Sequence, residues 1–287
     1  MSTILICGHR SYASRGLKDL LEVKGHKVLC FSRGDMKRER DVITGPVKEL
    51  DKNPYISENI DVVINFILLQ NTSVEENVAY IDSLITFCNL KKVKRLIQIS
   101  SISAYPNDAP IIREDTPTET DLSKKGGYGI IKSAADNRLE SAKRNCAFEI
   151  IFVRPGYIVA DDNPHPFKGV AQFFGSKLAV LIGNKHSTLP CILRSTLHAC
   201  LEEIVVQDNP LPVYLLVEGV GTTKYSYFKS QSNSVVIPLP KRFFELVANT
   251  AKCLHVIDDK TASGIKGVFK VQEFDNTQTK SKLHNLK

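Results

Sequence analysis

The chain has 287 residues, a length that suits one α/β domain with a modest extension better than two large domains. Apolar residues make up 43% of it, which excludes global disorder, and the longest apolar run, at 62–69, is too short to span a bilayer. The formal net charge is +7, but no aromatic residues interleave with the short basic runs, so we expect neither a nucleic-acid nor a membrane partner.

The cysteines are scattered through the chain, with no C-x-x-C pair and no histidine cluster beside them. The seven stand at positions 7, 30, 88, 146, 191, 200 and 253. An odd number without a pairing pattern predicts reduced thiols, a cytoplasmic location and no metal site. The first residues also lack the basic region and cleavage site of a secretory leader.

Apolar runs and helical periodicity alternate along the first half of the chain. The pattern predicts strands at 3–7, 26–33, 61–67, 93–100 and 148–155, and helices at 16–25, 75–90 and 128–144. Residues 34–58 are polar and poorly patterned, and residues 106–127 read as a long loop with three prolines. Strands that alternate with helices indicate βαβ units and a parallel sheet covered on both faces.

This order predicts a Rossmann-type, doubly wound parallel sheet over residues 1–160. The loops after residues 7, 33, 66, 101 and 156 should share the carboxyl edge of the sheet, where ligands bind in such folds. After residue 160 the pattern predicts helices at 170–183, 194–209 and 241–254 and a strand at 213–219. We expect residues 161–287 to form a smaller α/β substrate lobe, interleaved with the first domain.

The first strand ends in the sequence ILICGHRSYASRG at 4–16. On the spacing of a dinucleotide-binding turn, Gly8 keeps the first glycine, while serines stand at the second and third positions. The candidate phosphate ligands here are Gly8, Arg10, Ser11, Tyr12 and Ser14. An ordinary strand–turn–helix is the alternative interpretation of this loop.

The second strand ends in FSRG, which places Ser32 and Arg33 where NAD sites carry an acidic residue. An arginine suits a 2′-phosphate, so this position favours NADP, with NAD as the alternative. An exposed loop arginine without a ligand is the competing interpretation.

Two further segments suggest catalysis. QISSISAYP at 98–106 places serines at a strand end, and YGIIKSAAD at 128–136 places Tyr128 and Lys132 one helical turn apart. An ammonium near a phenol favours the phenolate, which lets a tyrosine act as acid or base. A serine hydroxyl opposite can hold the reacting oxygen of the substrate.

Together these motifs resemble the extended short-chain dehydrogenases/reductases of the NAD-dependent epimerase/dehydratase family, which act on nucleotide sugars. The resemblance extends from the Gly8 loop through DVVINF, the 75–101 segment, S-x-x-x-Y, Y-x-x-x-K and FVRPGYIV to FDNTQTKSKLHNL. It implies that Ser101 orients the substrate, with Ser100 as its rival, that Tyr128 is the acid/base, and that Lys132 holds the nicotinamide ribose.

The resemblance also implies that Phe66 and Pro155 lie near the nicotinamide. Arg194 would lie near a substrate diphosphate, although a structural role suits it equally. Two departures from the family pattern are visible: the opening loop has one glycine where the family has three, and Phe66 is bulkier than the small residue usual after this strand.

The implied function is an NAD(P)-dependent oxidoreductase, or an epimerase/4-ketoreductase, on a nucleotide-linked sugar. Ile102 and Ser103 stand where 4,6-dehydratases of this type need an acid pair, which argues against dehydration. A dinucleotide-binding regulatory protein and a reductase of non-sugar carbonyls remain the alternatives. Among the oligomeric states that the resemblance allows is a homodimer through the tyrosine-bearing helix and its neighbour.

Overall fold

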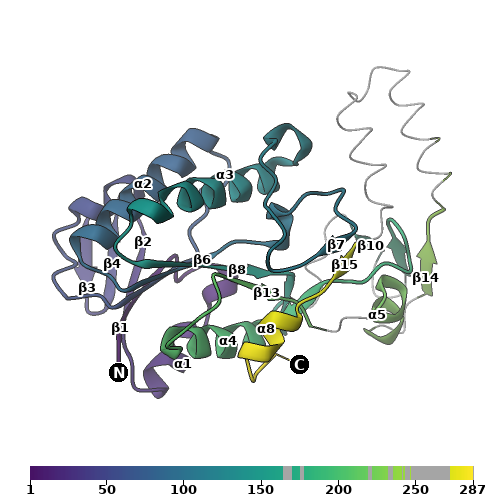
Figure 1. The fold of residues 1–287 in the computed structure, drawn as a ribbon. Helices are drawn as coiled ribbons and strands as arrows, with labels where there is room; N and C mark the ends of the chain where they lie inside the picture. Colours follow the sequence, from purple (N-terminus) through teal and green to yellow (C-terminus); the bar gives the residue numbers. More distant parts are fainter. Residues whose placement is uncertain are drawn as a thin grey trace.

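A parallel sheet forms the centre of the molecule. The computed structural model describes residues 1–163, 170–174, 178–218, 222–231, 235–240, 242, 246 and 272–286. The sheet strands are β1 (Thr3–Cys7), β2 (Lys27–Arg33), β3 (Lys37–Glu39), β4 (Val42–Gly45), β5 (Val62–Asn65), β6 (Arg95–Ile99), β8 (Glu149–Pro155) and β13 (Val213–Leu216). They lie in the order β13-β8-β6-β5-β1-β2-β4-β3, and only the edge strand β3 runs antiparallel to its neighbour (Figure 1).

Helices cover both faces of this sheet (Figure 1). On one face lie α2 (Val74–Leu90) and α3 (Gly127–Ala142); on the other lie α1 (Leu17–Val23), α4 (Arg194–Val206) and α8 (Thr277–Lys282). Along β1, Ile4 and Ile6 join the core beneath α1 and α4, whereas Leu5 and Cys7 join the core beneath α2. This strand alternation between two buried layers confirms the doubly wound Rossmann-type fold.

Short elements occupy two regions that the sequence left without pattern. Residues 34–58 contain β3, β4 and a 3₁₀ helix at Val47–Lys52. Within 106–127, β7 (Ile111–Ile112) pairs with β15 (Glu273–Phe274) from near the end of the chain. Strands of two to four residues are too short to display an apolar alternation, so they could not be predicted from the local pattern.

The helix predicted at 170–183 is wrong. The described residues there form β10 (Ala171–Phe174) and β11 (Leu178–Leu181), an antiparallel pair that continues to β14 (Val235–Pro238). Burial along β11 alternates residue by residue, with Ala179 and Leu181 inside, which is the period of a strand. Short apolar runs flank Gly175, Ser176 and Lys177 in this segment, and runs of that length do not separate a helix from a strand.

The chain after residue 160 contributes to both parts of the molecule. The strand expected at 213–219 is β13, which extends the main sheet beside β8, and the helix expected at 194–209 is α4. A short strand pair joins β9 (Tyr157–Val159), which follows β8, to β12 (Cys191–Leu193), which precedes α4. Helix α5 (Lys224–Gln231) lies beyond the sheet edge (Figure 1). The domain boundary at 160 stays a prediction, and the helix expected at 241–254 falls outside the described residues, apart from two single positions.

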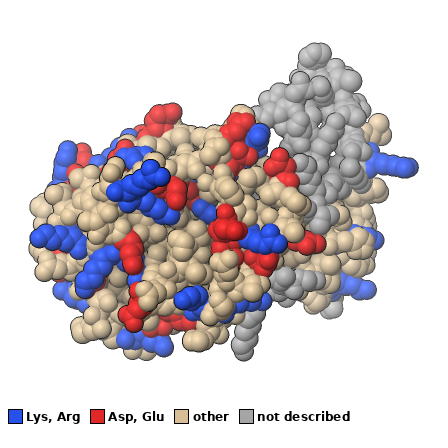
Figure 2. Space-filling model, viewed as in Figure 1, with Lys and Arg blue, Asp and Glu red and all other residues tan. Residues whose placement is uncertain are grey.

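The surface carries charges of both signs. On the face shown in Figure 2, basic and acidic side chains are interspersed over the main sheet layer. No helix in the described ranges combines the length and apolarity that a bilayer crossing needs.

Candidate active site

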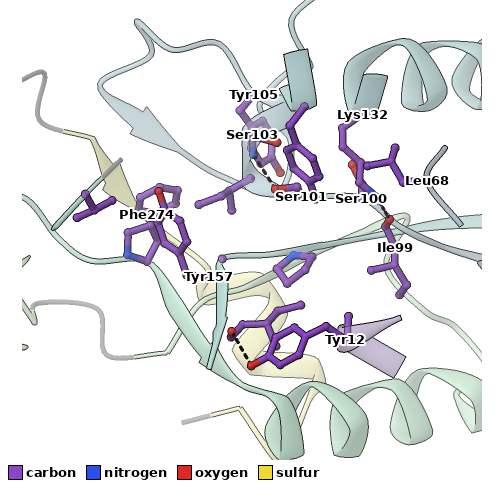
Figure 3. Close-up of a pocket in the computed structure, with 18 of the residues that line it drawn as sticks. Tyr12, Leu68, Ile99, Ser100, Ser101, Ser103, Tyr105, Lys132, Tyr157 and Phe274 are labelled. Atoms are coloured by element: carbon purple, nitrogen blue, oxygen red, sulfur yellow. Dashed lines mark hydrogen bonds between the residues drawn. The ribbon is translucent and has the colours of Figure 1, made fainter. Parts of the chain in front are cut away.

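A cavity of about 630 Å³ opens at the carboxyl edge of the sheet (Figure 3). Its walls come from the segments after β1, β5, β6 and β8, which the sequence placed at one edge; the loop after β2 does not line it. The lining includes Ser11–Ala13, Phe66, Leu68, Ile99–Ser103, Tyr128, Lys132 and Pro155–Ile158. Eight of the predicted site residues therefore meet in one cavity: Ser11, Tyr12, Phe66, Ser100, Ser101, Tyr128, Lys132 and Pro155.

Gly8 makes the turn at the end of β1. Its φ of +84° lies in the left-handed region, and its N–H donates to the Phe31 carbonyl at 2.7 Å. A Cβ on Gly8 would lie 3.0 Å from Ile67 Cγ1 and 3.1 Å from the Ile67 nitrogen. Glycine is thus required here by conformation and by the close approach of the segment after β5.

The two serines that replace glycines hold the opening loop together. Ser14 is buried, and its hydroxyl lies 2.8 Å from both the Gly8 carbonyl oxygen and Ser11 Oγ. Ser11 Oγ also accepts from the Ser14 N–H at 3.2 Å. These hydrogen bonds within the loop fix the position of the Ser11 side chain, which lines the cavity. Ser14 does not line the cavity.

Tyr12 ties this loop to the segment after β8. Its hydroxyl donates to the Ile158 carbonyl at 3.2 Å, a bond visible in Figure 3. The Arg194 guanidinium stacks 5.0 Å from the Tyr12 ring centroid and lies 3.0 Å from Asp162 Oδ1. Arg15 also pairs with Asp162, at 2.5 Å. Arg194 therefore has structural partners and is not among the cavity-lining residues; its substrate role stays a prediction.

The end of β2 lies outside the cavity. Ser32 is buried, and its hydroxyl has no hydrogen-bond partner in the part of the chain that the structure describes. Arg33 is exposed, as is Arg10 on the opening loop. Neither arginine forms an ion pair with a described residue, so both positive charges are free to meet a ligand.

Ser101, Tyr128 and Lys132 line the same cavity. Lys132 is 4% exposed and donates from Nζ to the Ile99 carbonyl at 2.6 Å, while this ammonium lies 5.9 Å from the centroid of the Tyr128 ring. The Tyr128 side chain reaches solvent, with 50% exposure. Helix α3 thus presents a fixed cation and an accessible phenol to one hollow.

The two rival serines have different partners. Ser100 donates its hydroxyl proton to Asp136 Oδ2 at 2.7 Å, deep in the protein. Ser101 Oγ accepts from the Ser103 N–H at 3.1 Å, which leaves its own proton available. The hydroxyl that can donate into the cavity is therefore that of Ser101.

Asp136 and Arg154 form a buried ion pair that the sequence reading missed. Arg154 Nη2 lies 3.2 Å from Asp136 Oδ2, and the side chains are 6% and 1% exposed. The guanidinium also stacks 4.6 Å from the Tyr105 ring centroid. Burial raises the pKa of Asp136, and Arg154 opposes that rise. The sequence does contain one indication of this pair, which is the arginine within the apolar run FEIIFVRP, because a buried guanidinium needs an acidic partner.

Further polar groups at the cavity were also missed. They include Ser103, Ser187 and Lys224, of which only Ser103 lies in a segment that the sequence singled out. Aspartate and glutamate are absent from the described lining, and the described residues hold no group of side chains suited to a metal ion.

Comparison with known proteins places these features in a family. Residues 4–197 match the family model described as "NAD dependent epimerase/dehydratase family". No curated protein sequence matches the chain.

Solved structures share the fold at low identity. The Bordetella bronchiseptica enzyme WbmG, solved with NAD and UDP, is 15% identical, with 98% of this chain and 87% of that chain covered and a TM-score of 0.66. The dTDP-glucose 4,6-dehydratase of Bacillus anthracis, solved with NAD, is 12% identical, with 98% and 90% covered and a TM-score of 0.68. The protein gox2253 is 16% identical, with 99% and 92% covered and a TM-score of 0.75.

Proposed function

Because the chain belongs to the NAD-dependent epimerase/dehydratase family, we propose that it is an NAD(P)-dependent reductase or epimerase acting on a nucleotide-linked sugar. The observation that carries the proposal is the meeting of Ser101, Tyr128 and Lys132 in one cavity at the carboxyl edge of the sheet. WbmG, with the same fold, was solved with NAD and UDP together.

The residues of the cavity suit the nicotinamide half of a dinucleotide, which supplies or accepts a hydride when bound. An ammonium has three donors, and Lys132 uses one on the Ile99 carbonyl, so the others can bind ribose hydroxyls. Phe66 and Pro155 offer apolar surface for the ring. The Gly8 turn and the Ser11–Ala13 segment lie where the pyrophosphate would pass.

Proton transfer falls to Tyr128. In the direction of reduction, its hydroxyl gives a proton to the substrate oxygen, which Ser101 holds by donating its free hydroxyl proton. Lys132, fixed by the Ile99 carbonyl, keeps a positive charge beside the phenol as that proton leaves. Ser100, next to Ser101, is held in place by its hydrogen bond to Asp136.

The cavity argues against dehydration. Elimination of water from a sugar needs an acid and a base besides the tyrosine, and no carboxylate stands in the described lining. Ile102 and Ser103 occupy the segment where such an acid pair would lie. One phenol suffices for a single hydride-coupled proton transfer, which suits reduction or epimerisation through a ketone.

For the cofactor we propose NADP over NAD. Arg33 ends β2, and Arg10 lies on the neighbouring loop after β1; both are exposed and without an ion pair among the described residues. A 2′-phosphate would supply their counter-charge. Their place outside the cavity suits an adenosine that lies along the sheet edge.

We also propose a cytoplasmic location and a homodimer. The six cysteines that the structure describes are all unpaired, as expected in a reducing compartment. The dimer would use the outer faces of α2 and α3, which Asp82 and Arg138 already join by an ion pair of 2.6 Å. Sedimentation velocity of the purified protein tests this state.

Tyr128→Phe tests the enzymatic proposal. With NADPH and a UDP-4-keto sugar, we expect the variant to lose at least about a hundredfold in turnover, because it removes the acid/base and little else. Dinucleotide binding, measured by calorimetry, should persist. Tyr55→Phe is the matched control, since Tyr55 is exposed outside the cavity.

The second candidate is a regulatory protein that binds dinucleotide without turnover. The observation that favours it is the closed hydrogen-bonding of Ser11 and Ser14 in the opening loop. Binding of NADPH without turnover of sugar or non-sugar carbonyls would support this candidate. Turnover of a non-sugar carbonyl, without turnover of a nucleotide sugar, would support the roles proposed for the catalytic residues but would contradict the proposed substrate class.

A further inference from the structure

One end of the cavity is built by residues 187–190 and the start of α5. The Lys224 N–H donates to the Ser187 carbonyl at 2.9 Å, so their two side chains leave neighbouring points of the backbone. Both residues line the same cavity as Tyr128. Figure 1 shows α5 beyond the sheet edge, far from β1–β4, so this end lies away from the opening loop.

The hydroxyl of Ser187 has no hydrogen-bond partner among the residues that the structure describes. Its side chain is buried, with 3% exposure of the residue, and Oγ makes no hydrogen bond to any described residue. Buried polar groups in native proteins are nearly always bonded. A hydroxyl that lines a cavity and bonds to none of the described groups can obtain a partner from a ligand.

The ammonium of Lys224 likewise has no acidic partner in the described part of the chain. It forms no ion pair and no side-chain hydrogen bond with the described residues, and burial lowers its pKa. No acidic side chain is present in the described lining. The N–H groups of Lys224 and Tyr225 already donate to the carbonyls of Ser187 and Lys185, so a ligand meets the side chains and not the helix end.

We propose that Lys224 and Ser187 form an oxyanion subsite for a phosphoryl or carboxylate group of the substrate. An oxyanion accepts from the ammonium and from the hydroxyl, and thereby satisfies both groups. The proposal deepens the proposed function and rests on it for the identity of the bound molecule as substrate. It places the negative charge of that substrate at the α5 end of the cavity.

Acetylation of Lys224 tests the subsite directly. The protein is treated with acetic anhydride in inorganic pyrophosphate, glucuronate or sodium chloride at equal ionic strength, and the modified peptides are quantified by mass spectrometry. At ten times its dissociation constant, a bound anion should slow the labelling of Lys224 about tenfold by mass action. Lys229, exposed on the same helix, is the internal control and should label equally in all three salts.

The two anions separate the two chemistries. Stronger protection by pyrophosphate assigns a phosphoryl group, and stronger protection by glucuronate assigns a carboxylate. Ser187→Ala should weaken the protection, because it removes one of the two donors. Equal labelling of Lys224 in all three salts overturns the proposal. Since the measurement uses neither dinucleotide nor nucleotide sugar, that result leaves the Tyr128→Phe test of the function standing.

Discussion

The carboxylate of Asp136 accepts a 2.7 Å hydrogen bond from the hydroxyl of Ser100, the residue before the proposed substrate-binding serine. Asp136 lies one helical turn beyond Lys132 on α3, and it also pairs with Arg154 on β8. One buried carboxylate therefore links the helix that carries the phenol and the ammonium to two strands beneath the cavity. Its removal should disturb folding more than any surface pair.

Asp136→Ala should lower the free energy of unfolding by about 3–5 kcal/mol, because it leaves the Arg154 guanidinium buried and unpaired. Urea denaturation measures the loss. The control is Asp82→Ala, which breaks the half-exposed pair with Arg138 and should cost under about 1 kcal/mol. Equal losses in the two variants would contradict the assignment of a buried, coupled pair.

Gly8→Ala should destabilise the protein more than Gly16→Ala. Both glycines have left-handed φ values, +84° and +90°, so each alanine meets backbone strain. Only at Gly8 would the Cβ also press on Ile67, whereas nothing lies within 4 Å at Gly16. We expect an additional loss of about 1–3 kcal/mol at Gly8, read from the denaturation midpoints. The same loss at both sites would contradict this prediction, because it would show that the segments after β1 and β5 can move apart to accommodate the Cβ.

Arg33→Glu should weaken NADPH binding about tenfold or more and leave NADH binding unchanged, because one charge-assisted bond to the 2′-phosphate is lost and a repulsion is added. Calorimetry with each dinucleotide gives the two affinities. Lys52→Glu makes the same change of charge at an exposed position and should affect neither. A parallel loss for NADPH and NADH would count against the NADP assignment.

Glu58 gives the fold an acid-side dependence on pH. The bidentate hydrogen bonds from Arg38 lower the pKa of Glu58 to about 2. A carboxylate whose folded pKa is depressed stabilises the protein above its unfolded pKa, and this contribution is lost as the pH falls towards about 2. Glu58→Gln should therefore lower stability at neutral pH and flatten the loss of stability between neutral and acid conditions.

Unfolding curves at several pH values provide the measurement. Glu39→Gln is the control, because Glu39 pairs with Lys37 on the exposed edge strand, where solvent screens the interaction. A variant at Glu58 that loses stability with falling pH as steeply as the wild type would show that other carboxylates dominate.

The long, repetitive features of the fold were predictable. Alternation of apolar runs and helical periodicity located the central strands and α2, α3 and α4 because each has enough residues to display its period. At 170–183, the apolar runs on either side of Gly175–Lys177 were too short to show a period, and β11 also depends on pairing with β14, which is distant in sequence. Pairings such as β7 with β15 join segments far apart in the sequence, so local sequence patterns cannot predict them.

The site divides in the same way. Tyr128 and Lys132 were recognisable because their spacing lies within one helix, and Ser101 because it ends a strand. Ser187 lies in a loop and Lys224 begins α5, and these two segments meet only in the folded chain. Asp136 was overlooked because a charged residue on a helix usually faces solvent. Here the Asp136 side chain points into the protein and pairs with the buried Arg154.

The absence of acidic groups from the described lining has a kinetic consequence. Lys132 and Lys224 give the hollow a positive potential, which raises the local concentration of anions and speeds their diffusional encounter with it. Added salt screens this attraction over a Debye length of about 10 Å at 0.1 M. Capture of a negatively charged ligand should therefore slow with ionic strength, while the chemical step that follows binding should be insensitive to it.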